Sequence, residues 1–139
     1  MKIGIIGAMD IEVEELINSM DDIKKEDISR IDFYEGKLQD KDVVVAKCGV
    51  GKVHAAVCTQ TMILKYAPDA IINIGVAGSL SNELDFADIV ISDGVVQHDF
   101  DVSPFGKPVG LITGIELIKI PCSEELVKRL LSAAEILED

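Results

Sequence analysis

Residues 2–12 of this chain read KIGIIGAMDIE. The apolar run Lys2–Ile6 is typical of a strand buried in an open α/β sheet, and Gly7 begins a turn that leads into a helical pattern. Ligand sites of such sheets lie where a strand ends and the next helix begins, so Glu12 stands where an acid can take part in chemistry. This stretch therefore predicts an α/β fold and a first candidate catalytic residue.

The rest of the chain continues this alternation of strand-like and helical patterns. Further strands are predicted at residues 31–38, 43–47, 70–74 and 89–96, and helices at residues 12–20, 52–66 and 123–137. The short connection between the strands at 31–38 and 43–47 predicts an antiparallel hairpin. We therefore expect a mixed central sheet flanked by helices, which argues against a plain dinucleotide-binding fold.

The length of the chain, 139 residues, is that of one domain with a single core. The last predicted helix begins with Ser123 as its N-cap and carries an apolar stripe that ends at Leu137. A helix of this kind normally packs on a sheet and leads to another strand, but only two residues follow it. We therefore expect one domain over residues 1–139 that is incomplete on its C-terminal side.

The composition limits the partners of the protein. The net charge of −12 disfavours nucleic acid and anionic membranes, because their phosphates would be repelled. No apolar run approaches the roughly 20 residues that span a bilayer, and no signal peptide is present, so a cytoplasmic protein is expected. The apolar content of 48% indicates strands buried on both faces and an apolar subunit interface. These features favour an oligomer with a small ligand that is uncharged or cationic.

Metal and disulfide sites have little support in the sequence. The three cysteines, Cys48, Cys58 and Cys122, are widely spaced and are interpreted as reduced thiols. His98, Asp99 and Asp101 share one loop, but a divalent ion would need further ligands at helical or strand spacing. We expect no metal here, and hydrogen bonds from the aspartates that order the loop.

Two Gly-containing turns follow later strands. Residues 49–52, GVGK, open a helix, so their amides could receive an anion or a sugar hydroxyl, or serve only as a tight connection. Residues 73–79, NIGVAGS, leave room for a ligand ring or for close packing. Glu12 also has two interpretations, because Glu14 and Glu15 follow it and the three could form a solvated helix face.

At these residues the chain resembles the 5′-methylthioadenosine/S-adenosylhomocysteine nucleosidases, within the purine and uridine nucleoside phosphorylase-like superfamily. The resemblance follows the chain in order, through residues 2–9 with Glu12, then 49–53, 71–78, 88–93 and 98–106. It implies hydrolysis of the adenine N-glycosidic bond of 5′-methylthioadenosine and S-adenosylhomocysteine in methionine salvage. It also implies a homodimer and no cofactor.

The resemblance assigns roles to single residues. Glu12 matches the glutamate that activates water, and Phe105 matches an aromatic residue that reaches across the dimer interface to cover the 5′-alkylthio group. Substrate-binding positions are matched by Ala8, Met9, Val50, Val76, Ala77 and Gly78, although many relatives have a small polar residue at the position of Val76. The family's purine-protonating aspartate, ribose-binding glutamate and adenine-stacking aromatic belong to a C-terminal part without counterpart in these 139 residues.

Two other functions stay open. A nucleoside phosphorylase needs basic residues that hold phosphate, whereas the turn before Glu12 offers an acid that would repel it. A dimeric remnant that is inert, or that only binds a ligand, follows from the missing C-terminal part. Release of adenine and its dependence on phosphate distinguish these functions. The residues do not decide between 5′-methylthioadenosine, S-adenosylhomocysteine, 5′-deoxyadenosine and a futalosine-type nucleoside.

Overall fold

The computed structural model describes residues 1–136. The chain divides into two compact units, Met1–Gly78 and Ser79–Asp139. The expectation of one domain over residues 1–139 stays a prediction. Among the described residues, no helix combines the length and the apolar character that crossing a bilayer requires.

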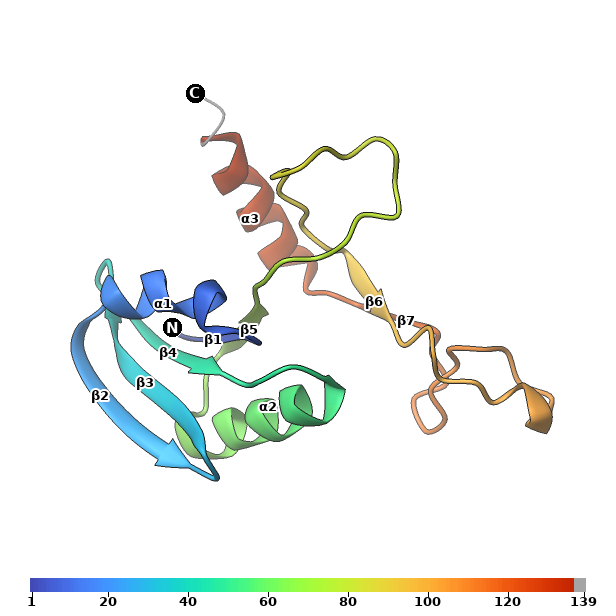
Figure 1. Cartoon of the computed structure of the whole chain (residues 1–139), viewed down its shortest axis with the longest axis horizontal. Helices are drawn as coiled ribbons and strands as arrows, with labels where there is room; N and C mark the ends of the chain where they lie inside the picture. The colour runs from blue at the N-terminus through green and yellow to red at the C-terminus, as the bar shows by residue number, and fades with distance from the viewer. Residues whose placement is uncertain (137–139) are drawn as a thin grey trace. The chain divides into compact units, whose positions relative to one another are not determined.

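The first unit is a mixed sheet of five strands with one helix against each face (Figure 1). Its elements are β1 (Lys2–Gly7), α1 (Asp10–Asn18), β2 (Asp21–Ile28), β3 (Ile31–Leu38), β4 (Lys41–Lys47), α2 (Lys52–Tyr66) and β5 (Ala70–Asn73). The strand order is β2-β3-β4-β1-β5, with β1 parallel to both β4 and β5, and β3 antiparallel to both β2 and β4. The predicted mixed sheet and the antiparallel hairpin are confirmed.

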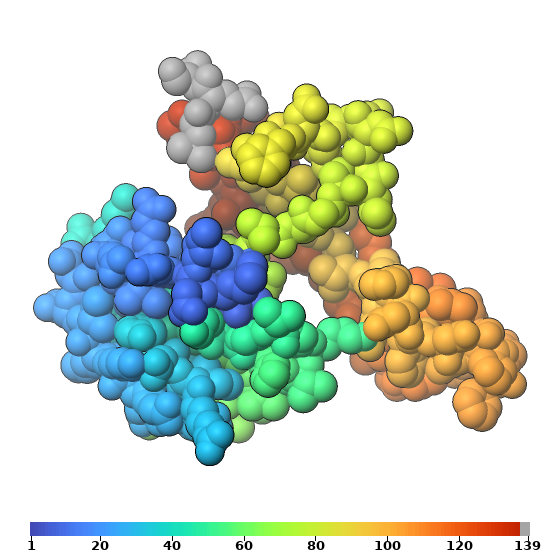
Figure 2. Space-filling model, in the orientation of Figure 1, coloured from blue at the N-terminus to red at the C-terminus, as the bar shows by residue number. Residues whose placement is uncertain are grey.

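The sheet separates two hydrophobic cores, where the length of the chain had predicted one. On β4, Val44 packs with Met62 of α2, whereas Val43 and Val45 lie in the core of the other face with Val13 of α1. Each of these side chains is at most 2% exposed. Because burial of one such side chain contributes about 1.5–3 kcal/mol, both faces hold the central strands in place. Figure 2 shows this unit, coloured blue to green, as a closely filled body.

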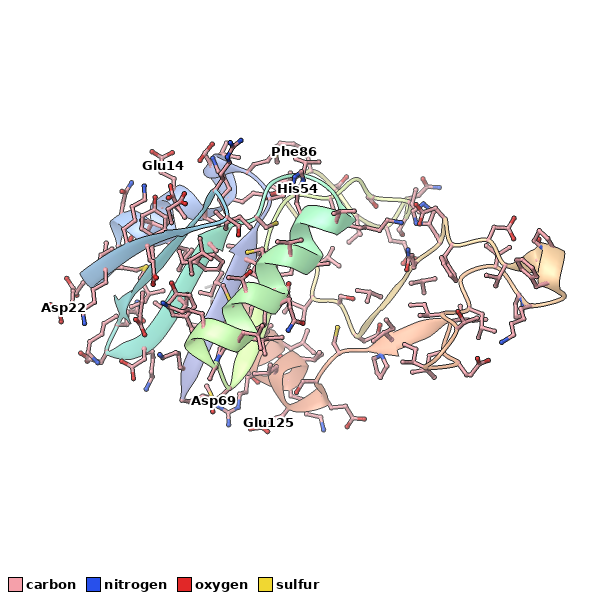
Figure 3. The ribbon with its side chains drawn as sticks, turned by 90° about the horizontal axis from the view of Figure 1, so that it is seen from below. Glu14, Asp22, His54, Asp69, Phe86 and Glu125 are labelled. Carbon is pink, nitrogen blue, oxygen red and sulfur yellow. The ribbon has the colours of Figure 1, made fainter. Side chains whose placement is uncertain are left out.

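Helix α2 lies across one face of the sheet, with His54 near its first turn and Asp69 beyond its last (Figure 3). The predicted bounds of this helix, residues 52–66, are those of the structure. It begins after Gly51 and ends at Ala67, whose φ of 46° lies in the left-handed region. Pro68 follows and cannot continue a helix.

The sequence missed strand β2. Its residues, DDIKKEDI, are exposed at seven of eight positions, so they show no apolar alternation. The strand forms because it pairs with β3 through the two-residue turn Ser29–Arg30, both at positive φ. A salt bridge of 2.8 Å between Lys25 Nζ and Asp32 Oδ2 links the two strands. Such a charged edge strand resists pairing with other chains.

The second unit contains little regular structure. Its elements are β6 (Gly94–Val96), the 3-10 turn η1 (Ser103–Phe105), β7 (Lys119–Pro121) and α3 (Glu124–Glu135). The prediction of α3 is confirmed, and its N-cap Ser123 accepts a hydrogen bond from the Leu126 amide at 3.4 Å. The predicted end of the helix at Leu137 lies outside the described residues.

The predicted strand at residues 89–96 is wrong over most of its length. Only Gly94–Val96 forms a strand, which pairs antiparallel with Lys119–Pro121. The side chains of Ile89 and Val90 are 68% and 66% exposed. An apolar run forms a strand only where a neighbouring strand receives its hydrogen bonds, and within the described residues that neighbour spans three positions.

Candidate active site

The carboxyl ends of three parallel strands, β1, β4 and β5, meet at one edge of the first unit's sheet. Two backbone hydrogen bonds continue the ladders past the strand ends, from the Cys48 amide to the Gly7 carbonyl at 2.8 Å and from the Ile74 amide to the Ile6 carbonyl at 2.9 Å. The turns that leave these strands therefore start side by side. They carry most of the residues predicted for the site, namely Ala8, Met9, Val50, Val76, Ala77 and Gly78.

Glu12 lies at this edge, in the first turn of α1. Its Oε2 accepts hydrogen bonds from the backbone amides of Ala8 at 2.6 Å and Met9 at 2.9 Å. Its Oε1 accepts one from the amide of Val76 at 3.0 Å. The carboxylate thus satisfies amides that the start of the helix leaves unpaired, and it also joins the turn after β1 to the turn after β5.

Gly75 makes room for this carboxylate, and Gly7 makes room for the neighbouring Val13. A Cβ atom on Gly75 would lie 2.5 Å from Oε1 and 2.9 Å from Cδ of Glu12. A Cβ atom on Gly7 would lie 3.1 Å from Glu12 Cβ and 2.6 Å from a methyl carbon of Val13. Gly75 therefore excludes a side chain as long as Glu12 keeps its place, and Gly7 excludes one as long as Val13 does.

The surroundings of Glu12 favour its ionised form. The pKa of its carboxyl is lowered from the ordinary value of 4.5, chiefly by the Val76 amide and then by that of Met9, with a further contribution from Ala8. Partial burial opposes this shift without cancelling it. Glu12 is half-buried, whereas Glu14 and Glu15 are exposed. The structure therefore separates Glu12 from a merely solvated helix face.

The turn after β4 is a tight connection into α2. Gly49 and Gly51 have φ values of 85° and 109°, which a residue with a side chain rarely adopts. The ring Nδ1 of His54, a residue of α2, donates a hydrogen bond to the Val50 carbonyl at 2.8 Å and so links the turn to the helix. The side chain of Val50 is 72% exposed at this edge. Its role in substrate binding stays a prediction.

The remaining predicted residues lie in exposed backbone. Val76 contributes its amide to Glu12, while its side chain is 78% exposed, so the substitution of a small polar residue by valine keeps this contact. Ala77 and Gly78 follow it and are exposed. Phe105, in η1 of the second unit, is 85% exposed. The binding roles of these residues stay predictions.

Two cysteines, Cys48 and Cys58, are not activated nucleophiles. Cys48, Cys58 and Cys122 are free thiols. Burial raises the pKa of Cys58 to about 11. It also raises the pKa of Cys48, with a further contribution from the negative charge of Glu12. Because the thiolate is the reactive form, these two buried side chains act as apolar packing groups.

The loop that carries Asp101 is ordered by a hydrogen bond, as predicted. Asp101 Oδ1 accepts a hydrogen bond from the Ser103 amide at 2.8 Å, and hydrogen bonds from Ser103 lower its pKa. In the part of the chain that the structure describes, no three His, Cys, Asp or Glu side chains gather as metal ligands would.

Sequence reasoning missed the part that Gly75 plays beside Glu12. The residue was noted only as one of several small residues that end a strand. The available signal was its place in the turn after a predicted parallel strand, which positions it at the same edge as residues 8–12. Gly75 and Glu12 are 63 residues apart along the chain, so local sequence patterns do not indicate their contact.

The comparisons with known proteins identify the family of this chain. The family model described as the phosphorylase superfamily matches residues 2–138. A 5′-methylthioadenosine/S-adenosylhomocysteine nucleosidase of Shewanella sediminis is 53% identical over 110 residues, which make up 79% of this chain and 48% of the relative. The chain spans about half the length of the curated relatives it matches.

Solved structures of similar proteins cover nearly the whole chain. The nucleosidase of the same name from Neisseria meningitidis, in complex with methylthio-immucillin-A, has a TM-score of 0.95 at 36% identity, covering 99% of this chain and 59% of that one. A futalosine hydrolase of Helicobacter pylori has a TM-score of 0.92 at 33% identity, with the same coverage.

Proposed function

The chain belongs to the phosphorylase superfamily, and we propose that the protein hydrolyses the adenine N-glycosidic bond of 5′-methylthioadenosine and S-adenosylhomocysteine. The observation that carries this proposal is the Glu12 carboxylate, held by three backbone amides where parallel strands end. The names of the similar proteins support the reaction and its substrates. Because the chain spans about half the length of these relatives, the reaction is proposed for the whole protein.

Glu12 is held as an ionised carboxylate, the form that can accept a proton from water. Cleavage of an N-glycosidic bond passes through a state in which the sugar resembles an oxocarbenium ion. In the proposed step, a water oxygen bonds to the anomeric carbon while Glu12 accepts a proton from that water. The bond to adenine breaks, its electron pair stays with the base, and an acid protonates the base. The family resemblance assigns this acid to the C-terminal part, so Glu12 serves the water side of the reaction.

The Glu12 carboxylate occupies the start of α1, and this favours hydrolysis over phosphorolysis. A helix N-terminus with free amides is an anion site, and a phosphorylase could use it for phosphate. In this chain the amides of Ala8 and Met9 are already bound to the Glu12 carboxylate. An anionic second substrate would meet a negative charge there in place of donors.

The substrate pocket is proposed from the edge residues. The residues proposed to bind the ribose and adenine of the substrate are Ala8, Met9, Val50, Val76, Ala77 and Gly78. Phe105 is proposed to cover the 5′ group of a substrate bound to the partner subunit of a homodimer. We also propose that the protein acts in the cytoplasm, in methionine salvage. The similarity to a futalosine hydrolase makes a futalosine-type nucleoside the first other substrate to test.

The test is release of free adenine from 5′-methylthioadenosine in a buffer without phosphate, with Glu12→Gln as the control. We expect the whole wild-type protein to release adenine, and its Glu12→Gln variant to lose about 10²–10⁴-fold in rate, the range for one general base. A strict requirement for phosphate would replace hydrolysis by phosphorolysis. No release from the folded whole protein would overturn the proposed reaction and favour a protein that only binds a ligand or is inert.

A further inference from the structure

The two oxygens of the Glu12 carboxylate are not equivalent. Oε2 accepts two hydrogen bonds, from Ala8 and Met9, whereas Oε1 accepts one, from Val76, among the described residues. A carboxylate oxygen offers two acceptor positions. The protein backbone thus uses both positions of Oε2 and one of Oε1.

Gly75, which has no side chain, lies beside Oε1. A Cβ atom on Gly75 would lie 2.5 Å from Oε1, 2.9 Å from Cδ and 3.3 Å from Oε2. These separations are below or at the limit of real Cβ contacts, so alanine would either cover Oε1 or push the carboxylate away from its amides. The atom that would meet alanine most closely is the oxygen that keeps an acceptor position.

We propose that Gly75 is a positioning residue for Glu12, and that its missing side chain keeps Oε1 open as the oxygen that accepts the proton of the attacking water. The inference rests on the proposed function of Glu12. Oε2 has the opposite task, since its two bonds to Ala8 and Met9 fix the carboxylate at the start of α1. One oxygen anchors the group and the other reacts.

A double-mutant cycle tests the contact without any need for activity. The unfolding midpoints in urea are compared for the wild-type chain, Gly75→Ala, Glu12→Ala and the double variant. We expect Gly75→Ala to lower the midpoint when Glu12 is present and to lower it much less when residue 12 is alanine. Strain of the backbone at residue 75 would be the same in both backgrounds, so an equal loss in both, complete unfolding included, would overturn the proposal.

The carboxyl pKa of Glu12 gives a readout that a merely structural role would not move. Titration by carbon NMR is expected to show a higher pKa in Gly75→Ala than in the wild type, because the carboxylate loses amide donors. Gly78→Ala is the matched control, since its added Cβ would meet no atom within 4 Å. It is expected to leave the pKa unchanged. An unchanged pKa in Gly75→Ala would overturn the proposal.

Adenine release separates this proposal from the function on which it rests. Where the wild type releases adenine, Gly75→Ala is expected to lower kcat by about 10²-fold or more with little change in KM. An equal kcat in the two proteins would overturn the proposal. If the wild type releases no adenine, the proposed hydrolysis fails, while the cycle and the pKa still decide whether Gly75 positions Glu12.

Discussion

The two units of the chain bury their apolar side chains to very different degrees. Among the described residues, every buried hydrophobic side chain belongs to the first unit, between Ile5 and Tyr66. In the second unit Leu80 and Phe86 are fully exposed, and α3 buries none of its residues. The site therefore depends on strands that are fixed by hydrophobic cores. All three amides that bind Glu12 lie between residues 8 and 76, at strand ends fixed by cores on both faces.

The largest effect is expected when the two units are separated. A fragment of residues 1–78 contains both cores and every described partner of Glu12, so we expect it to fold cooperatively. A fragment of residues 79–139 is expected to stay unfolded, because its described residues, 79–136, form no buried core that offsets the conformational entropy. Circular dichroism during thermal unfolding checks both. A cooperative transition in the second fragment alone would break the comparison.

Substitution of a single side chain by alanine should show the same difference in stability between the two units, with a smaller effect. Phe33→Ala is expected to lower the free energy of unfolding by about 3–5 kcal/mol. The Phe33 side chain is 0% exposed, and the centre of its ring lies 5.4 Å from that of Tyr66. Leu80→Ala removes a fully exposed side chain and is expected to change stability by less than about 0.5 kcal/mol. Urea unfolding of the whole chain measures both. Equal costs would contradict the assignment of the core to the first unit.

A carboxylate in each unit gives the smallest and most specific contrast. The pKa of Glu12 is lowered, so its contribution to stability is present above pH 4.5 and is lost as the pH falls through its value in the folded state. Glu12→Gln is expected to cost about 1 kcal/mol at pH 7, as loss of a helix cap does, and to have less effect at pH 3. The pKa of Asp101 is lowered too, but this residue is exposed on a loop.

Asp101→Asn is therefore the matched control in the second unit. We expect it to change the pH dependence of unfolding less than Glu12→Gln does. Urea unfolding at pH 7, 5 and 3 measures the two variants beside the wild type. If Asp101→Asn had the larger effect, the strands fixed by hydrophobic cores would not be what distinguishes Glu12.

The elements with clear patterns were predictable from the sequence. Helix α2 and strand β3 have the predicted bounds because the spacing of their apolar residues is a local signal. For α2, Gly51 and Pro68 add local signals at the two ends of the helix. Strand β2 was missed because its charged residues carry no such pattern, and it forms only by pairing with β3. The prediction of a strand at residues 89–96 failed for the opposite reason, since most of these residues are apolar but only Gly94–Val96 pair with another strand.

The candidate site was predictable in part. The place of Glu12 after a buried strand indicated an acid at the ligand edge, and the structure puts it there with the turn after β5. The contact of Val76 and Gly75 with its carboxylate could not be predicted from local pattern, because it depends on how two parallel strands align. Val76 acts through its amide, which no choice of side chain reveals.

The most direct test of the account is an NMR pH titration of the whole chain that follows the Glu12 carboxyl carbon together with three amide protons, those of Ala8, Met9 and Val76. Because all three amides bind the ionised group, we expect a carboxyl pKa below 4.5 and amide shifts that change with the same midpoint. A pKa at or above 4.5, with amide shifts that do not follow the carboxyl, would contradict it.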